Sequence, residues 1–219
     1  MSSKKQSVVI IEDHPMVRER LTQIISKEPD LEVRGEADDM RHGLELIRGI
    51  LPDLAIVDIS LKDSNGLDLI KGLKASSVKT PILVFSMHDE AVYAQRALRA
   101  GASGYITKDR PSVEVLYAVR QVLAGECYLS QRMTSRVLKG LHNGRNESSV
   151  AGSIHRLTDR ELVVLEHIGR GCSTRKIAEA LQVGAATVDT YRARIKEKLN
   201  LQNAAELLHF AINWLRECE

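Results

Sequence analysis

Short, uninterrupted apolar runs recur through the first half of the chain, and each is followed by a longer stretch with helical spacing. The runs lie at residues 8–11, 54–57, 82–85 and around 105–106, with a weaker one at 31–33. Continuous rather than alternating apolar residues indicate strands that are buried on both faces, as in a parallel sheet covered by helices. The pattern therefore predicts an α/β domain built on a doubly wound, five-stranded parallel sheet.

The last third of the chain has a different pattern, with helical spacing alone. A helix opens at Leu157-Thr158-Asp159-Arg160-Glu161, where Thr158 and Glu161 form a capping box, and further helices are expected near 174–181, 186–199 and 203–216. A short helical stretch from Gln131 to Lys139 precedes residues 140–153, whose Gly, Ser and Asn content is typical of a flexible linker. We expect three parts: a domain at 1–125, a linker with a short helix at 126–154, and an all-α four-helix domain at 155–219.

Composition and charge narrow the class. With 43% hydrophobic and 27% charged residues, the chain is expected to fold around a core. Cys127, Cys172 and Cys218 form no CxxC pair, which fits neither a disulfide framework nor a zinc site and favours the cytoplasm. No apolar run near the start is long enough for a signal peptide or a membrane span. Residues 1–125 hold 17 basic and 18 acidic side chains and residues 126–219 hold 14 and 11, so a modest nucleic-acid patch is expected late in the chain.

Polar side chains stand where the predicted strands end. The first strand leads to Glu12 and Asp13, the third to Asp58, the fourth to Ser86, and the fifth passes through Tyr105 to Lys108. Ligands bind beyond the carboxyl ends of parallel strands, and three carboxylates gathered there require a divalent cation or a proton. Oxygen ligands suit Mg²⁺, while a lysine and a serine suit a phosphoryl group carried by Asp58 as nucleophile. Taken singly, each acid can also be a turn former or a helix cap.

These segments resemble the receiver domain of two-component response regulators. The residues that carry the resemblance are Val8-Val9-Ile10-Ile11-Glu12-Asp13-His14, Leu54-Ala55-Ile56-Val57-Asp58, Ser86 and Gly101-Ala102-Ser103-Gly104-Tyr105-Ile106-Thr107-Lys108. The resemblance implies a flavodoxin-like strand order, 2-1-3-4-5, and a Mg²⁺ site formed by Glu12, Asp13, Asp58 and the Ser60 carbonyl. It further implies that Asp58 accepts phosphate from a sensor histidine kinase or a phosphotransfer protein, and that Lys108 pairs with the phosphoryl oxygens.

Ser86 and Tyr105 would form the switch. Acyl phosphate at Asp58 adds charge and acceptor oxygens that draw the Ser86 hydroxyl inward, which leaves space for the Tyr105 ring. In the alternative interpretation Tyr105 is a half-buried aromatic whose hydroxyl reaches water. Gly66 matches the family, whereas Lys62 stands where such regulators commonly have proline. His88 and Ser60 are expected to flank the pocket.

The segments at 174–181 and 186–199, joined by Gln182-Val183-Gly184, fit a helix-turn-helix. Val188, Tyr191, Ile195 and Leu199 are spaced as a core stripe, which leaves a charged face that is either solvated or placed in a DNA major groove. Leu157-Thr158-Asp159-Arg160-Glu161, Lys176-Ile177-Ala178-Glu179, Thr187-Val188 and Lys198-Leu199 resemble the LuxR-type DNA-binding domain. By that resemblance Asp189, Thr190 and Ala193 face bases, while Arg192, Arg194, Lys196 and Lys198 are expected at phosphates.

Both resemblances together are those of the NarL/FixJ class of transcription factors. The last helix carries one apolar stripe, Ala204, Leu208, Ala211 and Leu215, which Leu207 and Trp214 widen beyond what one core face needs. The helix either closes the core and is fully buried, or it also pairs with a second copy. The family resemblance favours a homodimer on palindromic promoter sites. RNA polymerase is a candidate partner. The chain is therefore expected to be a regulator rather than an enzyme. Two alternatives stay open: an aspartyl-nucleophile phosphohydrolase, which needs an acid where Ser60 stands, and a regulator that acts through protein contacts without binding DNA.

Overall fold

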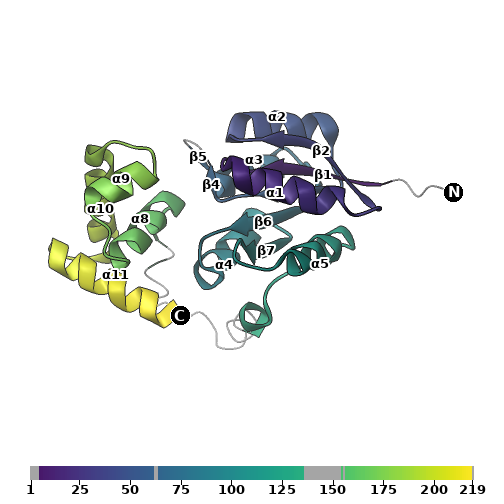
Figure 1. The fold of residues 1–219 in the computed structure, drawn as a ribbon. Coiled ribbons are helices and arrows are strands. Elements are labelled where there is room, and N and C mark those ends of the chain that lie inside the picture. The colour runs from purple at the N-terminus through teal and green to yellow at the C-terminus, as the bar shows by residue number, and fades with distance from the viewer. Residues whose placement is uncertain (1–4, 62–63, 136–153, 155, 219) are drawn as a thin grey trace. The chain divides into compact units, whose positions relative to one another are not determined.

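The computed structural model describes residues 5–61, 64–135, 154 and 156–218. The chain divides into two compact units, Met1–Val137 and Leu138–Glu219 (Figure 1). The domain and linker limits expected from the sequence, 1–125, 126–154 and 155–219, stay predictions. The flexible segment expected at 140–153 lies outside the described residues.

The first unit is built on a five-stranded parallel sheet. Its strands are β1 (Gln6–Ile11), β2 (Leu31–Ala37), β3 (Leu54–Val57), β6 (Ile82–Ser86) and β7 (Gly104–Thr107). They lie side by side in the order β2-β1-β3-β6-β7, which is 2-1-3-4-5 when only these strands are counted. The predicted fold class is confirmed.

Two layers of helices enclose the sheet. The helices are α1 (Pro15–Ser26), α2 (Met40–Ile50), α3 (Gly66–Ala75), α4 (Glu90–Ala100) and α5 (Ser112–Leu123). Leu21 of α1 and Val119 of α5 share an apolar cluster with Val8 and Ile10, so these two helices cover one face. Helices α2, α3 and α4 pack beside one another on the other face. Because successive strand residues point to opposite faces, both layers are needed to bury all four residues of β3.

Two small features extend this fold. A ribbon of two short antiparallel strands, β4 (Ser60–Leu61) and β5 (Ser64–Asn65), begins after Ile59, the residue that follows Asp58. After α5 the chain returns to the edge of the sheet, where the Tyr105 N–H donates to the Tyr128 carbonyl at 2.9 Å and the Tyr128 N–H donates to the Ser103 carbonyl at 3.2 Å. Residues 131–135 are helical, and the rest of the short helix predicted up to Lys139 lies outside the described residues.

The second unit contains four described helices, α8 (Asp159–Gly169), α9 (Thr174–Ala180), α10 (Ala185–Leu199) and α11 (Ala204–Cys218), as predicted. Helix α8 packs against α10 and α11, and α9 packs against α10. The capping box is confirmed: Thr158 Oγ1 accepts from the Glu161 N–H, and Glu161 Oε2 accepts from the Thr158 N–H. No helix among the described residues is long and apolar enough to cross a membrane.

Two details of this unit differ from the sequence pattern. In the turn between α9 and α10 the left-handed residue is Gln182, with φ of 53°, whereas Gly184 has φ of −71° and caps α10. In α11 the buried side consists of Leu207, Ala211 and Trp214, while Leu208 is 42% exposed. One side of α11 thus packs within the unit, and the other presents apolar surface.

Candidate functional site

The polar residues predicted at the strand ends meet at one edge of the sheet. Backbone hydrogen bonds place them there: the Asp58 N–H donates to the Ile11 carbonyl at 2.9 Å, and the Lys108 N–H donates to the Ser86 carbonyl at 2.9 Å. The Glu12 N–H donates to the Ala37 carbonyl of β2 at 3.0 Å. The parallel register therefore brings together side chains that are up to 96 positions apart, from Glu12 to Lys108.

A buried ion cluster forms the centre of this edge. Lys108 Nζ lies 2.6 Å from Glu12 Oε2 and 2.8 Å from Asp58 Oδ2, and the exposed fractions of the Glu12, Asp58 and Lys108 side chains are 1, 2 and 6%. Burial raises the pKa of Glu12, and the charge of Asp58 adds to this effect. Burial alone would lower the pKa of Lys108, but Asp58 and Glu12 hold it above its usual value. One ammonium thus faces two carboxylates.

The acids have the donor set of a hard divalent cation. Ligand atoms of Glu12, Asp13, His14 and Asp58 lie within 4.8 Å of one another. Among the described residues, none makes a hydrogen bond to the buried Asp58 Oδ1. Carboxylate oxygens, one of them buried and unsatisfied, fit Mg²⁺, which prefers oxygen ligands and keeps several of its waters.

His14 belongs to this cluster but was not singled out from the sequence. Its Nδ1 lies 2.7 Å from Asp13 Oδ1 and 3.2 Å from Glu12 Oε1, and the ring is mostly exposed. The signal was its position directly after the two acids. An imidazole nitrogen is a poor ligand for Mg²⁺, so His14 forms part of the rim.

Ser60, Ser86 and Tyr105 are all hydrogen-bonded to His88. The Tyr105 hydroxyl donates to the His88 carbonyl at 2.8 Å, and the His88 N–H donates to Ser86 Oγ at 3.3 Å. Ser60 Oγ lies 2.9 Å from His88 Nε2. The Tyr105 ring is fully buried, so the interpretation of a half-buried ring with its hydroxyl in water is wrong. His88 thus connects the loop after Asp58 with the two residues predicted to form the switch.

Gly66 is required by a close approach of two backbone segments. A Cβ at this position would lie 1.9 Å from the Asp58 carbonyl oxygen and 3.1 Å from Ile59 Cα. The Gly66 N–H donates to the Ile59 carbonyl at 2.8 Å, which folds the β4–β5 ribbon back onto the start of α3. Lys62, at the position where the family commonly has proline, lies outside the described residues.

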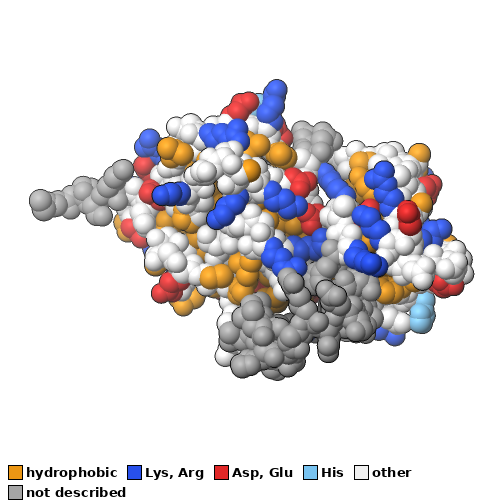
Figure 2. Space-filling model, turned by 180° about the vertical axis from the view of Figure 1, so that it is seen from behind, with side chains coloured by type: hydrophobic (Ala, Val, Ile, Leu, Met, Phe, Trp, Pro, Cys, Tyr) orange, Lys and Arg blue, Asp and Glu red, His pale blue; other side chains and the backbone are white. Residues whose placement is uncertain are grey.

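Helix α10 carries the residues expected to contact DNA. Asp189, Thr190, Ala193 and Arg194 are exposed, whereas Arg192, Lys196 and Lys198 are partly buried. Two of the basic residues have partners within the unit: Arg192 Nη1 donates to Thr174 Oγ1 at 3.2 Å, and Lys198 Nζ lies 2.6 Å from Glu161 Oε2. Figure 2 shows Lys and Arg side chains on this unit, interspersed with acidic ones.

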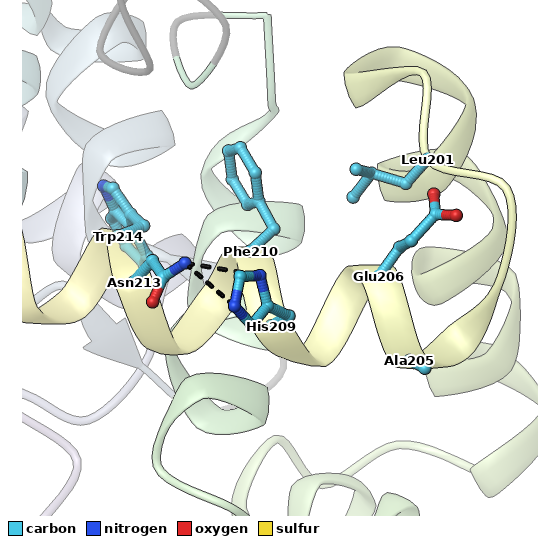
Figure 3. Close-up of a pocket in the computed structure, with 7 residues that line it drawn as sticks. All are labelled: Leu201, Ala205, Glu206, His209, Phe210, Asn213 and Trp214. Atoms are coloured by element: carbon cyan, nitrogen blue, oxygen red, sulfur yellow. Dashed lines mark hydrogen bonds between the residues drawn. The ribbon is translucent and has the colours of Figure 1, made fainter.

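An open hollow of roughly 520 Å³ lies beside α11. Figure 3 shows the seven residues that line it, Leu201, Ala205, Glu206, His209, Phe210, Asn213 and Trp214. Asn213 Nδ2 and His209 are hydrogen-bonded along the helix at 3.3 Å, beside the Phe210 ring. Of the apolar residues on which the predicted homodimer was based, Trp214 lines this hollow, Leu207 is buried within the unit and Leu208 is exposed.

Comparisons with known proteins support the resemblances found in both halves of the chain. The family of response regulator receiver domains matches residues 8–120, and the luxR family of bacterial regulatory proteins matches residues 155–211. Over 210 residues the chain is 34% identical to the Fimbriae Z protein of Salmonella typhimurium, covering 95% of this chain and 97% of that protein. Over 200 residues it is 32% identical to the nitrate/nitrite response regulator protein NarL of Escherichia coli, covering 91% and 92%.

A solved structure agrees for the part of the chain that it covers. The two-component response regulator of the LuxR family from Aurantimonas sp. SI85-9A1 matches with a TM-score of 0.58 and 29% identity, covering 62% of this chain and 97% of that one. A parallel sheet with an acidic edge, followed by a helix-turn-helix unit, defines the class of two-component regulators that bind DNA. The chain belongs to the response regulators of the NarL/FixJ class, with a receiver domain and a LuxR-type DNA-binding domain, as predicted.

Proposed function

We propose that Asp58 accepts a phosphoryl group from a sensor histidine kinase or a phosphotransfer protein. The observation that carries this proposal is the state of the Asp58 carboxylate: Oδ2 is held by Lys108, while Oδ1 is buried and accepts no hydrogen bond from a described residue. A carboxylate oxygen attacks the phosphorus, and the phosphorus–nitrogen bond of the donor phosphohistidine breaks. Lys108 then pairs with the phosphoryl oxygens.

The acids beside Asp58 are suited to hold Mg²⁺. Glu12, Asp13 and Asp58, with the Ser60 carbonyl, would supply its oxygen ligands, and the ion would neutralise charge that builds up during transfer. Lys108 alone balances only one of the two fully buried carboxylates, which is the reason to expect a second positive charge.

The hydrogen bonds of His88 support a link between phosphorylation and the receiver surface. A phosphoryl oxygen that accepts from the Ser86 hydroxyl changes the acceptor now used by the His88 N–H. The Tyr105 hydroxyl is bonded to the carbonyl of that same residue. A shift of His88 therefore moves the partner of Tyr105, and through β7 the change reaches the segment after α5.

The output of the chain is proposed to be transcriptional control in the cytoplasm. Asp189, Thr190 and Ala193 on α10 would face bases, with Arg192, Arg194 and Lys196 as phosphate contacts. Lys198, which was predicted together with them, is paired with Glu161. A homodimer formed on phosphorylation through α11 would match palindromic promoter sites, and the hollow beside Phe210 supports this surface. RNA polymerase is a further candidate partner. The phosphohydrolase alternative gains no support, because the position two residues after Asp58 is Ser60, which is bonded to His88.

Selection of bound sequences from random DNA tests these steps together. The wild-type chain is expected to enrich one palindromic sequence more strongly in the presence of a small-molecule phosphodonor. Asp58→Ala removes this gain, while Asp68→Asn, at an exposed acid of α3, keeps it. Equal enrichment by Asp58→Ala and the wild-type chain would refute the role of Asp58. A binding constant that does not depend on salt would favour a regulator that acts without DNA.

A further inference from the structure

Lys198 and Glu161 form an ion pair between two helices of the second unit. Lys198 stands in the last turn of α10 and Glu161 in the first turn of α8, and Nζ lies 2.6 Å from Oε2. The Glu161 side chain is 2% exposed and that of Lys198 is 33% exposed. The same carboxylate oxygen accepts from the Thr158 N–H at 2.7 Å. The pair thus connects the end of one helix with the capped start of the other.

Within the pair the charged form of Glu161 is favoured. Burial would raise the pKa of Glu161, but hydrogen bonds from Lys198 and Thr158 hold it below its usual value. The helix dipoles also favour this arrangement, because an anion lies at the N-terminus of α8 and a cation at the C-terminus of α10. Among the described residues Lys198 is the cation paired with Glu161. Removing it would leave a buried carboxylate without a partner charge, which strongly destabilises a fold.

We propose that Lys198 is a positioning residue that fixes the recognition helix α10 on α8, rather than a contact to DNA phosphate. The proposal rests on the proposed DNA binding of this unit. The charge of Lys198 is already compensated by a carboxylate 2.6 Å away, so the pair presents little net charge to DNA. Arg194 differs in this respect, because its side chain is exposed on the face of α10 that carries Thr190.

The position of the pair explains how it acts on binding. Within the described unit α10 is anchored by the buried side chains Val188 and Ile195 and by the Arg192–Thr174 hydrogen bond. Lys198 adds an anchor at the far end, one turn beyond Ile195. Without it the end of α10 can move away from α8, and the exposed residues nearer its start lose their fixed angle to the groove.

A salt series with the full chain separates positioning from phosphate contact. The probe is a duplex that the wild-type chain selects from random DNA. Arg194→Met is expected to lower the slope of log K against log salt by about 0.9, the amount for one released counterion. Lys198→Met is expected to leave the slope unchanged while weakening binding at every salt concentration, on the order of tenfold. Loss of about 0.9 from the slope in Lys198→Met would overturn the proposal.

A double variant provides the rescue. In E161Q/K198M the carboxylate charge is gone and the glutamine still accepts from the Thr158 N–H, so binding is expected to return toward the wild-type value. Lys198→Arg keeps the pair and is expected to bind like the wild-type chain. If E161Q/K198M binds as weakly as Lys198→Met, the lysine acts on DNA directly and positioning is refuted.

A readout without DNA keeps this test separate from the proposed function. Trp214 is the only tryptophan of the chain and lies buried in α11, so its fluorescence reports the unfolding of this unit in urea. Lys198→Met is expected to lower the urea midpoint, and E161Q/K198M to restore it. If the wild-type chain selects no duplex, the proposed DNA binding fails. The positioning proposal is overturned separately if Lys198→Met leaves the Trp214 midpoint unchanged.

Discussion

Replacing Gly66 by alanine tests how tightly the chain around Asp58 is held. The added Cβ would lie 1.9 Å from the Asp58 carbonyl oxygen, whereas a carbon and a carbonyl oxygen rest about 3.3 Å apart. One of the two backbones must therefore move by about 1.4 Å. The atoms that collide belong to the main chain, so no rotamer change relieves the contact. We expect a loss of about 3 kcal/mol in unfolding free energy, the upper end for overpacking.

The same displacement acts on the phosphoryl acceptor. A misplacement of about 1 Å can slow a reaction about a hundredfold, and we expect a slowing of that order when Gly66→Ala is phosphorylated by a small-molecule donor. Urea unfolding followed by circular dichroism measures the stability, and Trp214 fluorescence in the same samples reports the second unit, which should not change. Uptake of labelled phosphate measures the rate.

Gly49→Ala is the matched control. Gly49 also lies in a helix of the first unit, and its added Cβ meets no atom within 4 Å. Alanine is favoured over glycine in a helix by about 0.5–1 kcal/mol, so this variant should be slightly stabilised and fully active. If Gly66→Ala unfolds at the wild-type urea concentration and takes up phosphate at the wild-type rate, the close approach does not constrain the site.

Two further predictions concern charge. Mg²⁺ is expected to raise the melting temperature of the wild-type chain, because an ion that binds the folded state stabilises it. Glu12→Gln removes one of the proposed ligands, so its melting temperature should not rise. An equal rise in both proteins would exclude Glu12 as a ligand. The pKa of Glu161 is lower in the folded chain than its usual value of 4.5. Its contribution to stability is therefore fully present at a pH above 4.5 and is lost as the pH falls through the pKa of the folded state. The urea midpoint of Trp214 should therefore fall in acid below about pH 4.5 in the wild-type chain and less in Glu161→Gln; parallel curves would contradict this assignment.

The sheet was predictable where burial leaves a continuous apolar run. β3 is such a run, and Asp58 at its end could be placed at the edge from strand order alone. β2 was seen only as a weak run at 31–33, because it is an edge strand in which Arg34 and Glu36 alternate with less exposed residues. The β4–β5 ribbon has two residues in each strand, too few for any period.

Contacts between distant polar residues were not predictable from the pattern. The Lys198–Glu161 pair spans 37 positions and depends on how α10 packs on α8, so the sequence offered only a basic residue on a helix. The hydrogen bonds of His88 to Ser60 and Tyr105 likewise depend on the path of a loop. Thr158 and Glu161, by contrast, are three residues apart, and their capping box was read from local spacing.

The return of the chain to β7 bears on how the receiver is to be isolated. Tyr128 covers the outer edge of the sheet, and its hydroxyl donates to Glu114 of α5 at 3.0 Å while the Ser130 N–H donates to Glu90 of α4 at 2.7 Å. A receiver truncated at residue 125 would expose the edge of β7, and a bare sheet edge recruits other strands. Self-association of so short a fragment would then result from the exposed strand edge rather than from phosphorylation. Receiver fragments for such measurements should therefore end beyond Met133.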